Sequence, residues 1–248
     1  MTSTAKHSTQ RVLIVGATSG IARAVAHRLA SRGYALVLAA RDSEAIDRDA
    51  ADLRVRHQVE VETRPFDALD FDSHAALADG LELCAAVVCH GVMLSNEVAA
   101  ADIHDHRRMI DINYTSYASV LEVLATYFEE KGDGVIAAIS SVAGDRGRPS
   151  NYCYGATKAA VSAYLSGLRG RLRPKGVAVL TIKPGPTDTP MTHGLKAKGP
   201  TATPEAVAKQ IVKDIEKRRS IGYTPRKWWP IMTIIRAIPE WVFKRLSL

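Results

Sequence analysis

A tyrosine and a lysine four residues apart, Tyr154 and Lys158, have the spacing and chemistry of a proton-transfer pair. If both lie on one helix they share a face, because residues i and i+4 are neighbours one turn apart. A positive charge about 4 Å from a phenol, at an effective dielectric constant of about 20, favours the phenolate by roughly 4 kcal/mol, or about three pKa units. Tyr154 is therefore predicted to have a lowered pKa and to exchange protons near neutral pH. The alternative is an ordinary solvated pair on a helix surface.

A serine, Ser141, precedes Tyr154 by thirteen positions and follows an apolar run at residues 134–139. Such a run is typical of a buried strand, so the Ser141 hydroxyl is predicted to project from the end of that strand. From there it could hydrogen-bond the same substrate oxygen as Tyr154.

A glycine-rich segment at residues 16–22 lies between an apolar run at 11–15 and a helical pattern that continues to Ser31. Glycines at a strand-to-helix turn let backbone amides approach a pyrophosphate, which is also attracted to the positive end of the helix. This order predicts a dinucleotide site. Its predicted contacts are Gly16, Thr18, Ser19, Gly20 and Ile21.

The second predicted strand, residues 35–40, is followed by Arg41 and Asp42. At this place in a dinucleotide-binding fold a carboxylate binds a free ribose 2′-hydroxyl, whereas an arginine accommodates a 2′-phosphate. Arg41 therefore predicts NADP(H) as the cofactor. Two alternatives stay open: Asp42 could favour NAD, and Arg41 could be a solvent-facing residue at the start of a helix.

With this order and spacing of serine, tyrosine and lysine, the chain resembles the short-chain dehydrogenase/reductase family over residues 11–225. The resemblance implies that Ser141, Tyr154 and Lys158 are catalytic. Tyr154 would be the acid, Ser141 would orient the carbonyl, and Lys158 would also bind the nicotinamide ribose. It further implies that Asn113 kinks its helix and supports a proton relay from Lys158 to solvent.

The resemblance also implies cofactor contacts outside the glycine-rich segment. These are Asp67 at the adenine, Gly91 beside the nicotinamide ribose, and Pro184, Gly185, Thr187 and Thr189 near the nicotinamide amide and diphosphate. Two departures stand out. Ala22 replaces the third glycine, and Cys89 and His90 precede Gly91 where the family has Asn-Asn-Ala, which puts the polar stabilisation of that turn in doubt. His90 is assigned no chemistry.

The 248 residues contain no linker or low-complexity run, so we expect one α/β domain. Strands alternating with helices predict a Rossmann-type doubly wound parallel sheet with helices on both faces. Residues 1–10 form a polar extension without an apolar signal core, which favours a cytoplasmic protein. Three cysteines without metal-ligand spacing predict reduced core residues and no metal site. The net charge is +7, but there is no nucleic-acid-binding signature, so no nucleic acid partner is expected.

Residues 226–248 form a distinctive tail that contains all three tryptophans. Its longest uncharged run, 228–235, falls short of the roughly 20 residues needed to cross a bilayer. Tryptophans and branched aliphatics among lysines and arginines predict a helix that lies on an anionic membrane surface. The alternative is that the tail packs against its own domain or a partner subunit.

A closer resemblance concerns residues 66–70 with 72–74, 112–115, 143–146, and the tail at 238–239 and 243–246. These segments look like those of decaprenylphosphoryl-2-keto-ribose reductases, which implies a keto group on a polyprenyl-linked pentose. Family resemblance also implies a homodimer or homotetramer through the helices at 103–130 and 156–173. Met191, His193, Leu195 and Lys196 are expected to line the substrate pocket.

The sequence therefore predicts an NADP(H)-dependent carbonyl reductase, or in reverse an alcohol dehydrogenase, that acts on a ketone or keto-sugar. The alternatives are a soluble or lipophilic ketone as substrate, and a non-catalytic dinucleotide-binding scaffold.

Overall fold

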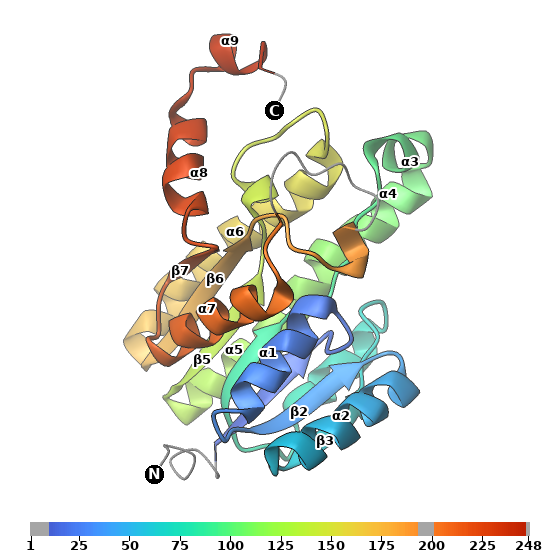
Figure 1. Cartoon of the computed structure of the whole chain (residues 1–248), viewed down its shortest axis with the longest axis vertical. Helices are drawn as coiled ribbons and strands as arrows, with labels where there is room; N and C mark the ends of the chain where they lie inside the picture. Colours follow the sequence, from blue (N-terminus) through green and yellow to red (C-terminus); the bar gives the residue numbers. More distant parts are fainter. Residues whose placement is uncertain (1–9, 193–200, 247–248) are drawn as a thin grey trace.

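The computed structural model describes residues 10–192 and 201–246 (Figure 1). In this part of the chain seven parallel strands form one sheet in the order β3-β2-β1-β4-β5-β6-β7. The strands are β1 (Arg11–Val15), β2 (Ala35–Ala40), β3 (Val61–Pro65), β4 (Leu83–Val88), β5 (Gly134–Ile139), β6 (Val177–Pro184) and β7 (Ile221–Thr224).

Helices cover both faces of this sheet (Figure 1). They are α1 (Gly20–Ala30), α2 (Ser43–His57), α3 (Asn96–Ala101), α4 (Ile103–Ile110), α5 (Ser116–Lys131), α6 (Tyr152–Leu172), α7 (Pro204–Glu216), α8 (Trp228–Ala237) and α9 (Glu240–Phe243).

Alternate residues of each strand point to opposite faces of the sheet, so the interior is divided into two hydrophobic cores. In β1, Val12 and Ile14 pack with α1, α2 and α7, whereas Leu13 and Val15 pack with α5 and α6. Successive strand residues point to opposite faces, so a strand covered on both sides must be apolar at every position. The prediction of a doubly wound parallel sheet is confirmed.

The helix predicted at 103–130 is interrupted. A π-helical turn, η3 (Asp111–Thr115), separates α4 from α5. Asn113 lies in this turn, and such turns occur where a side chain is drawn into other contacts. At Asn113, where a kink was expected, the helix is thus interrupted by a π-helical turn.

The strand order reverses between β1 and β4, because the chain after β1 builds one side of the sheet and the chain after β4 builds the other. Beyond the carboxyl ends of strands at such a switch point lies a crevice in which ligands bind. The segments that carry the predicted site all leave the sheet at this edge, after β1, β2, β3, β4, β5 and β6.

The three cysteines are unpaired; Cys89 and Cys153 are buried, as predicted, whereas Cys84 is only partly buried. The tail forms α8 and α9, which extend beyond the sheet (Figure 1). No helix among the described residues has the length and apolar character needed to cross a membrane.

Candidate active site

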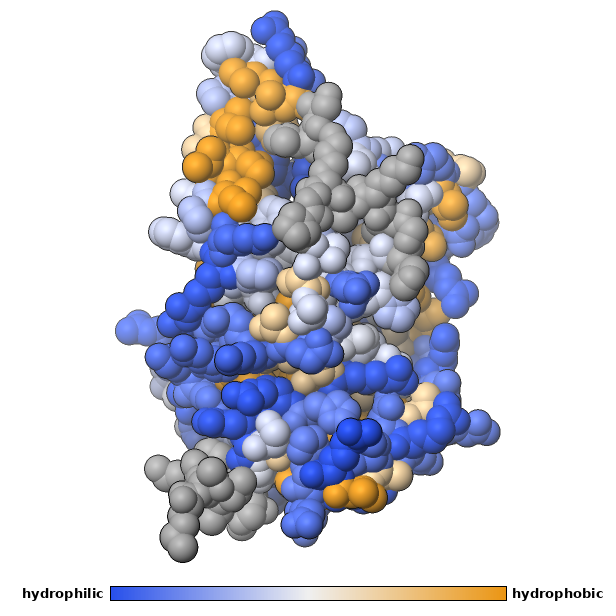
Figure 2. Space-filling model, in the orientation of Figure 1, coloured by the Kyte–Doolittle hydropathy of each residue, from blue (hydrophilic) through white to orange (hydrophobic). Residues whose placement is uncertain are grey.

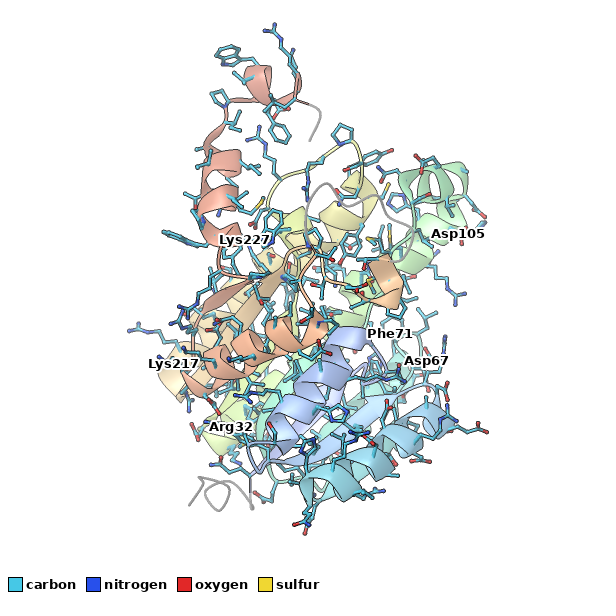
Figure 3. All side chains as sticks on the ribbon, in the orientation of Figure 1. Arg32, Asp67, Phe71, Asp105, Lys217 and Lys227 are labelled. Atoms are coloured by element: carbon cyan, nitrogen blue, oxygen red, sulfur yellow. The ribbon has the colours of Figure 1, made fainter. Side chains whose placement is uncertain are left out.

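A cavity of about 1540 Å³ lies at the carboxyl edge of the sheet. It brings together every predicted catalytic and cofactor-binding residue except Asn113. They are Gly16, Thr18, Ser19, Gly20, Ile21, Arg41, Asp67, Gly91, Ser141, Tyr154, Lys158, Pro184, Gly185, Thr187 and Thr189. In Figure 3 the labelled Asp67 lies on the side of β2 and β3, and Lys227 lies at the start of α8.

The glycine turn after β1 has the geometry of a phosphate cradle. Gly16 has a φ of 78°, and a Cβ at this position would stand 2.5 Å from the backbone nitrogen of His90. Ser19 caps α1, because its Oγ accepts a hydrogen bond from the Ala22 amide at 3.2 Å. The positive end of α1 therefore faces the cavity, and the site fits a dinucleotide diphosphate. Ala22 is fully buried, so a small residue suffices there.

Arg41 and Asp42 have separate roles at the end of β2. The Asp42 carboxylate caps α2 by accepting a hydrogen bond from the Ala45 amide at 2.9 Å. Arg41 is exposed and lines the cavity. The group that would bind a ribose 2′-hydroxyl is thus engaged in the helix cap, while the guanidinium is available to an anion.

The segment after β5 presses against the helix that carries Tyr154. Ser141 is extended, and its Oγ accepts a hydrogen bond from the Ala143 amide at 3.0 Å. A Cβ on Gly144 would stand 2.6 Å from the carbonyl carbon of Lys158, so only glycine permits this contact. The close approach brings Ser141 and Tyr154 to the same cavity.

Lys158 is buried among neutral groups. Its Nζ donates a hydrogen bond to the Ile139 carbonyl at 3.1 Å and lies 4.7 Å from the ring centroid of Tyr117. Its distance to the ring centroid of Tyr154 is 5.8 Å. Burial lowers the pKa of Lys158 to about 8.

The predicted lowering of the Tyr154 pKa is wrong in this structure. Burial raises the pKa of Tyr154 to about 12, and the nearby Ser141 hydroxyl offsets only part of this rise. Tyr154 keeps part of its surface open to the cavity, so water there moderates the effect. The physical reason for the difference is that Lys158 points towards Ile139 and Tyr117, and desolvation outweighs its charge.

Asn113 supports the site from behind. It is 0% exposed, its Oδ1 accepts a hydrogen bond from the Val92 amide at 2.8 Å, and its Nδ2 donates to the Val92 carbonyl at 2.8 Å. Nδ2 also donates to Thr157 Oγ1 at 3.3 Å. Asn113 thus joins the segment after β4 to α6, and its part in a proton relay stays a prediction.

Two residues that the sequence analysis did not single out stabilise the turn at His90. The Tyr117 hydroxyl donates to the His90 carbonyl at 2.7 Å, and Ser116 Oγ lies 3.0 Å from His90 Nε2. Burial lowers the pKa of His90 well below its ordinary value, so the ring is neutral. The missing asparagines are therefore replaced by a serine and a tyrosine that follow Asn113 on the next turn of helix.

The segment after β6 is held by its own threonines. Thr187 Oγ1 donates to the Gly185 carbonyl at 3.0 Å, and Thr192 Oγ1 donates to the Thr189 carbonyl at 2.9 Å. Met191 lines the cavity as predicted. His193, Leu195 and Lys196 lie outside the described residues.

The tail contributes to the same cavity, which the sequence analysis did not predict. Trp228, Lys244, Arg245 and Leu246 line it together with Arg148. Hydrophobic periodicity alone could not find this contact, because the tail reaches the site only through the folding of the whole chain.

A doubly wound sheet with a glycine turn, a serine, a tyrosine and a lysine around one cavity defines an oxidoreductase that binds a nicotinamide dinucleotide. The chain belongs to the short chain dehydrogenase family, which matches residues 10–199.

Relatives and solved structures agree with this class. An uncharacterized oxidoreductase of Mycobacterium tuberculosis is 32% identical over 240 residues, which cover 95% of this chain and 96% of the relative. A sulfoacetaldehyde reductase of Chromohalobacter salexigens is 34% identical over 190 residues, covering 74% and 75%. A short-chain dehydrogenase from Sphingobium yanoikuyae in complex with NADPH is 27% identical and superposes with a TM-score of 0.81, covering 93% of this chain and 97% of that one.

Proposed function

We propose that this protein is an NADP(H)-dependent carbonyl reductase that transfers a hydride to a ketone or keto-sugar. The observation that carries the proposal is the placement of Ser141, Tyr154 and Lys158 on one cavity with the glycine turn after β1 and Arg41. A non-catalytic dinucleotide-binding scaffold would not require these three side chains to converge.

The preference for NADP(H) rests on the end of β2. The Asp42 carboxylate is engaged by the Ala45 amide, whereas Arg41 has no hydrogen-bond or ion-pair partner among the described residues. A free guanidinium in the cavity suits a 2′-phosphate, which it can bind through two parallel hydrogen bonds. The NADPH complex of the Sphingobium yanoikuyae protein supports the same choice.

The residues of the site have complementary roles in reduction. NADPH, when bound, supplies the hydride. Tyr154 holds its proton at neutral pH because its pKa is raised, which suits a general acid that donates to the carbonyl oxygen. The Ser141 hydroxyl orients that oxygen and stabilises the developing alkoxide, and Lys158, whose pKa is about 8, remains mostly cationic near pH 7 and can bind the nicotinamide ribose.

The tail side of the cavity points to the substrate class. Trp228 and Leu246 supply apolar surface there, and Lys244 and Arg245 supply positive charge. These side chains suit a keto-sugar carried on a polyprenyl phosphate, and we propose this as the finer assignment. A small anionic aldehyde is the second candidate, because the cations also suit it and a 34% identical relative is named a sulfoacetaldehyde reductase.

The test is a substrate screen that follows NADPH oxidation with lipid-linked keto-sugars, anionic aldehydes and neutral ketones. The matched variant is Tyr154→Phe, which keeps the ring and removes the proton. We expect turnover to fall by roughly 10²- to 10⁴-fold, the usual contribution of general acid catalysis. NADPH affinity, measured by fluorescence, should be unchanged.

Three outcomes would count against parts of the proposal. Near-normal turnover in Tyr154→Phe would refute Tyr154 as the acid. Turnover of soluble compounds without any turnover of lipid-linked ones would refute the finer assignment. NADPH binding without turnover of any carbonyl compound would favour the scaffold.

A further inference from the structure

Helix α8 is apolar on both of its sides. On the inner side Met232 is fully buried and packs with Val142 and Tyr223. The outer side is exposed, and Arg236 is the only charged residue of the helix. The exposed uncharged residues are Trp229, Pro230, Ile231, Thr233, Ile234 and Ala237. A helix that is hydrophobic all round is normally covered on every side.

The apolar surface continues onto α9. Trp229 is 63% exposed, Ile234 is 67% exposed and Trp241 is 64% exposed. Figure 2 shows hydrophobic residues gathered over α8 and α9, at the end of the molecule that extends beyond the sheet. We call Trp229, Ile231, Ile234 and Trp241 the tail surface. Contiguous exposed apolar surface of this kind marks an interaction site.

The body of the protein holds this surface in place. The Arg146 guanidinium donates hydrogen bonds to the carbonyls of Ile238 at 2.7 Å and Ile235 at 3.3 Å, which lie at the end of α8. It also pairs with Glu240 at 2.6 Å and stacks over the Phe243 ring at 4.1 Å from the centroid. The exposure of the tail surface is therefore a feature of a packed segment with defined contacts.

Positive charge flanks the tail surface. Arg226 and Lys227 precede it, Lys244 and Arg245 follow it, and all four side chains are exposed. The one carboxylate of the segment, Glu240, is paired with Arg146. An apolar strip with tryptophans between two pairs of cations matches the boundary of an anionic lipid bilayer, where apolar groups enter and cations meet headgroups.

We propose that the tail surface docks this protein on an anionic bilayer. A second copy of the chain fits less well for two reasons. The tail surface offers roughly a few hundred Å², given that a tryptophan buries about 150–250 Å², whereas a stable interface needs roughly 800 Å² from each partner. A symmetric contact would also bring the same cations of two copies together, which is repulsive.

Docking would set the orientation of the catalytic cavity. The Trp228 indole lies against Gly185, whose Cβ, if it had one, would stand 1.9 Å from Trp228 Nε1. Lys244, Arg245 and Leu246 line the cavity that contains Tyr154. The side of the cavity formed by the tail would thus adjoin the lipid. Docking on the bilayer does not depend on the reaction that the protein catalyses. The entry of a lipid-borne carbonyl substrate from the bilayer does rest on the proposed function.

The chain carries its own probe for this test, because its three tryptophans are Trp228, Trp229 and Trp241. The full-length protein is mixed with vesicles of phosphatidylcholine alone, or of phosphatidylcholine and phosphatidylglycerol in equal parts. We expect co-sedimentation with the anionic vesicles, a blue shift of tryptophan emission, and quenching by brominated acyl chains. Added salt should weaken binding without abolishing it, because apolar contact persists when charge is screened.

Matched variants distinguish binding through the tail surface from nonspecific adsorption of the protein to vesicles. Trp229→Ser and Trp241→Ser should each lower the vesicle partition coefficient by about tenfold or more, since each removes a large apolar side chain from lipid. Val55→Ser is the control, because Val55 is 81% exposed on α2 at the opposite end of the molecule (Figure 1) and should leave partitioning unchanged. All three variants should keep the melting temperature, since the replaced side chains are exposed.

Other results would overturn the proposal. Wild-type protein that stays in the supernatant with anionic vesicles would refute docking. A concentration-dependent dimer that Trp229→Ser dissolves would assign the tail surface to a second copy instead. NADPH oxidation with a soluble carbonyl substrate is measured in parallel. Retained activity without vesicle binding refutes docking alone, and vesicle binding without any activity refutes the proposed function alone.

Discussion

Tyr154 and Lys158 stand in the same wall of the cavity, and burial favours the neutral form of both side chains. The pKa of Tyr154 rises to about 12 and that of Lys158 falls to about 8. A single ammonium would lower the phenol pKa if it were close and if both groups were solvated, but here Lys158 Nζ donates to the Ile139 carbonyl. Tyr154 is thereby a proton donor in its resting form and needs a developing alkoxide to release its proton.

The pH dependence of the reaction follows from Lys158. Its pKa is lowered, so the ammonium is present below about pH 8 and is lost as the pH rises through that value. We expect kcat/KM for carbonyl reduction to fall above about pH 8, with no limb near pH 7 from Tyr154, which stays protonated. A pH–rate profile measures this, and a descending limb centred near pH 7 would contradict it.

The lowered pKa of Lys158 also makes the stability of the protein depend on pH. Unfolded Lys158 keeps its proton up to its ordinary pKa of 10.5, whereas the folded protein releases it at about 8. Between these values folding releases a proton, so this group makes stability rise with pH. The slope of unfolding free energy against pH should therefore be smaller in Lys158→Met than in the wild type over this window.

The cofactor preference is a second prediction for a single residue. Arg41→Asp should move the preference from NADPH towards NADH, because a carboxylate repels a 2′-phosphate and can accept a hydrogen bond from a free 2′-hydroxyl. The measurement is the ratio of kcat/KM for the two cofactors. A wild-type protein that already prefers NADH would show that Arg41 does not bind the phosphate.

Among the elements, the π-helical turn η3 organises the site. It turns Asn113 inward, where the side chain satisfies both backbone groups of Val92. Ser116 and Tyr117 follow at the start of α5 and stabilise His90. One irregular turn thus supports the whole segment after β4 that forms a wall of the cavity.

Asn113→Ala should destabilise the protein by about 1–3 kcal/mol, because it leaves the partly buried Val92 amide and carbonyl without their hydrogen-bond partners. It should also lower kcat, since the segment that it holds borders the cavity. Thr115→Ala, at an exposed position of the same turn, is the control and should change stability by less than about 0.5 kcal/mol. Thermal unfolding of both variants measures the difference, and equal effects would show that Asn113 has no special structural role.

At the scale of the whole molecule, one face of the tail packs against the body of the protein and the other face is exposed. Met232 lies with Val142 and Tyr223, and Arg146 caps the end of α8. The two alternatives that the sequence left open, packing and membrane contact, therefore describe opposite faces of one helix.

A matched pair of substitutions on α8 tests this arrangement. Met232→Ala should cost about 2–5 kcal/mol, because it leaves a cavity between the tail and the body. Ile234→Ala, on the exposed face of α8, should change stability by less than about 0.5 kcal/mol. Chemical denaturation gives both values, and a similar loss in the two variants would mean that both sides of α8 are covered in solution.

Much of the fold was accessible from the sequence because it depends on short-range patterns. The apolar runs at 11–15, 35–40 and 134–139 are strands with those bounds. The glycine turn, Ser141 and Tyr154 could be located in the same way, since each follows a strand or opens a helix. Parallel strands bring their carboxyl ends to one edge of a sheet, so residues at those ends must converge.

Other properties were decided only by the tertiary structure. The pKa of Tyr154 depends on what surrounds it, and the sequence shows the spacing of Lys158 but not the Ile139 carbonyl that its ammonium contacts. The polar support of His90 comes from α5, and the contact of the tail with the catalytic cavity joins segments far apart in the chain. These contacts are set by residues distant in the sequence, which local periodicity cannot bring together.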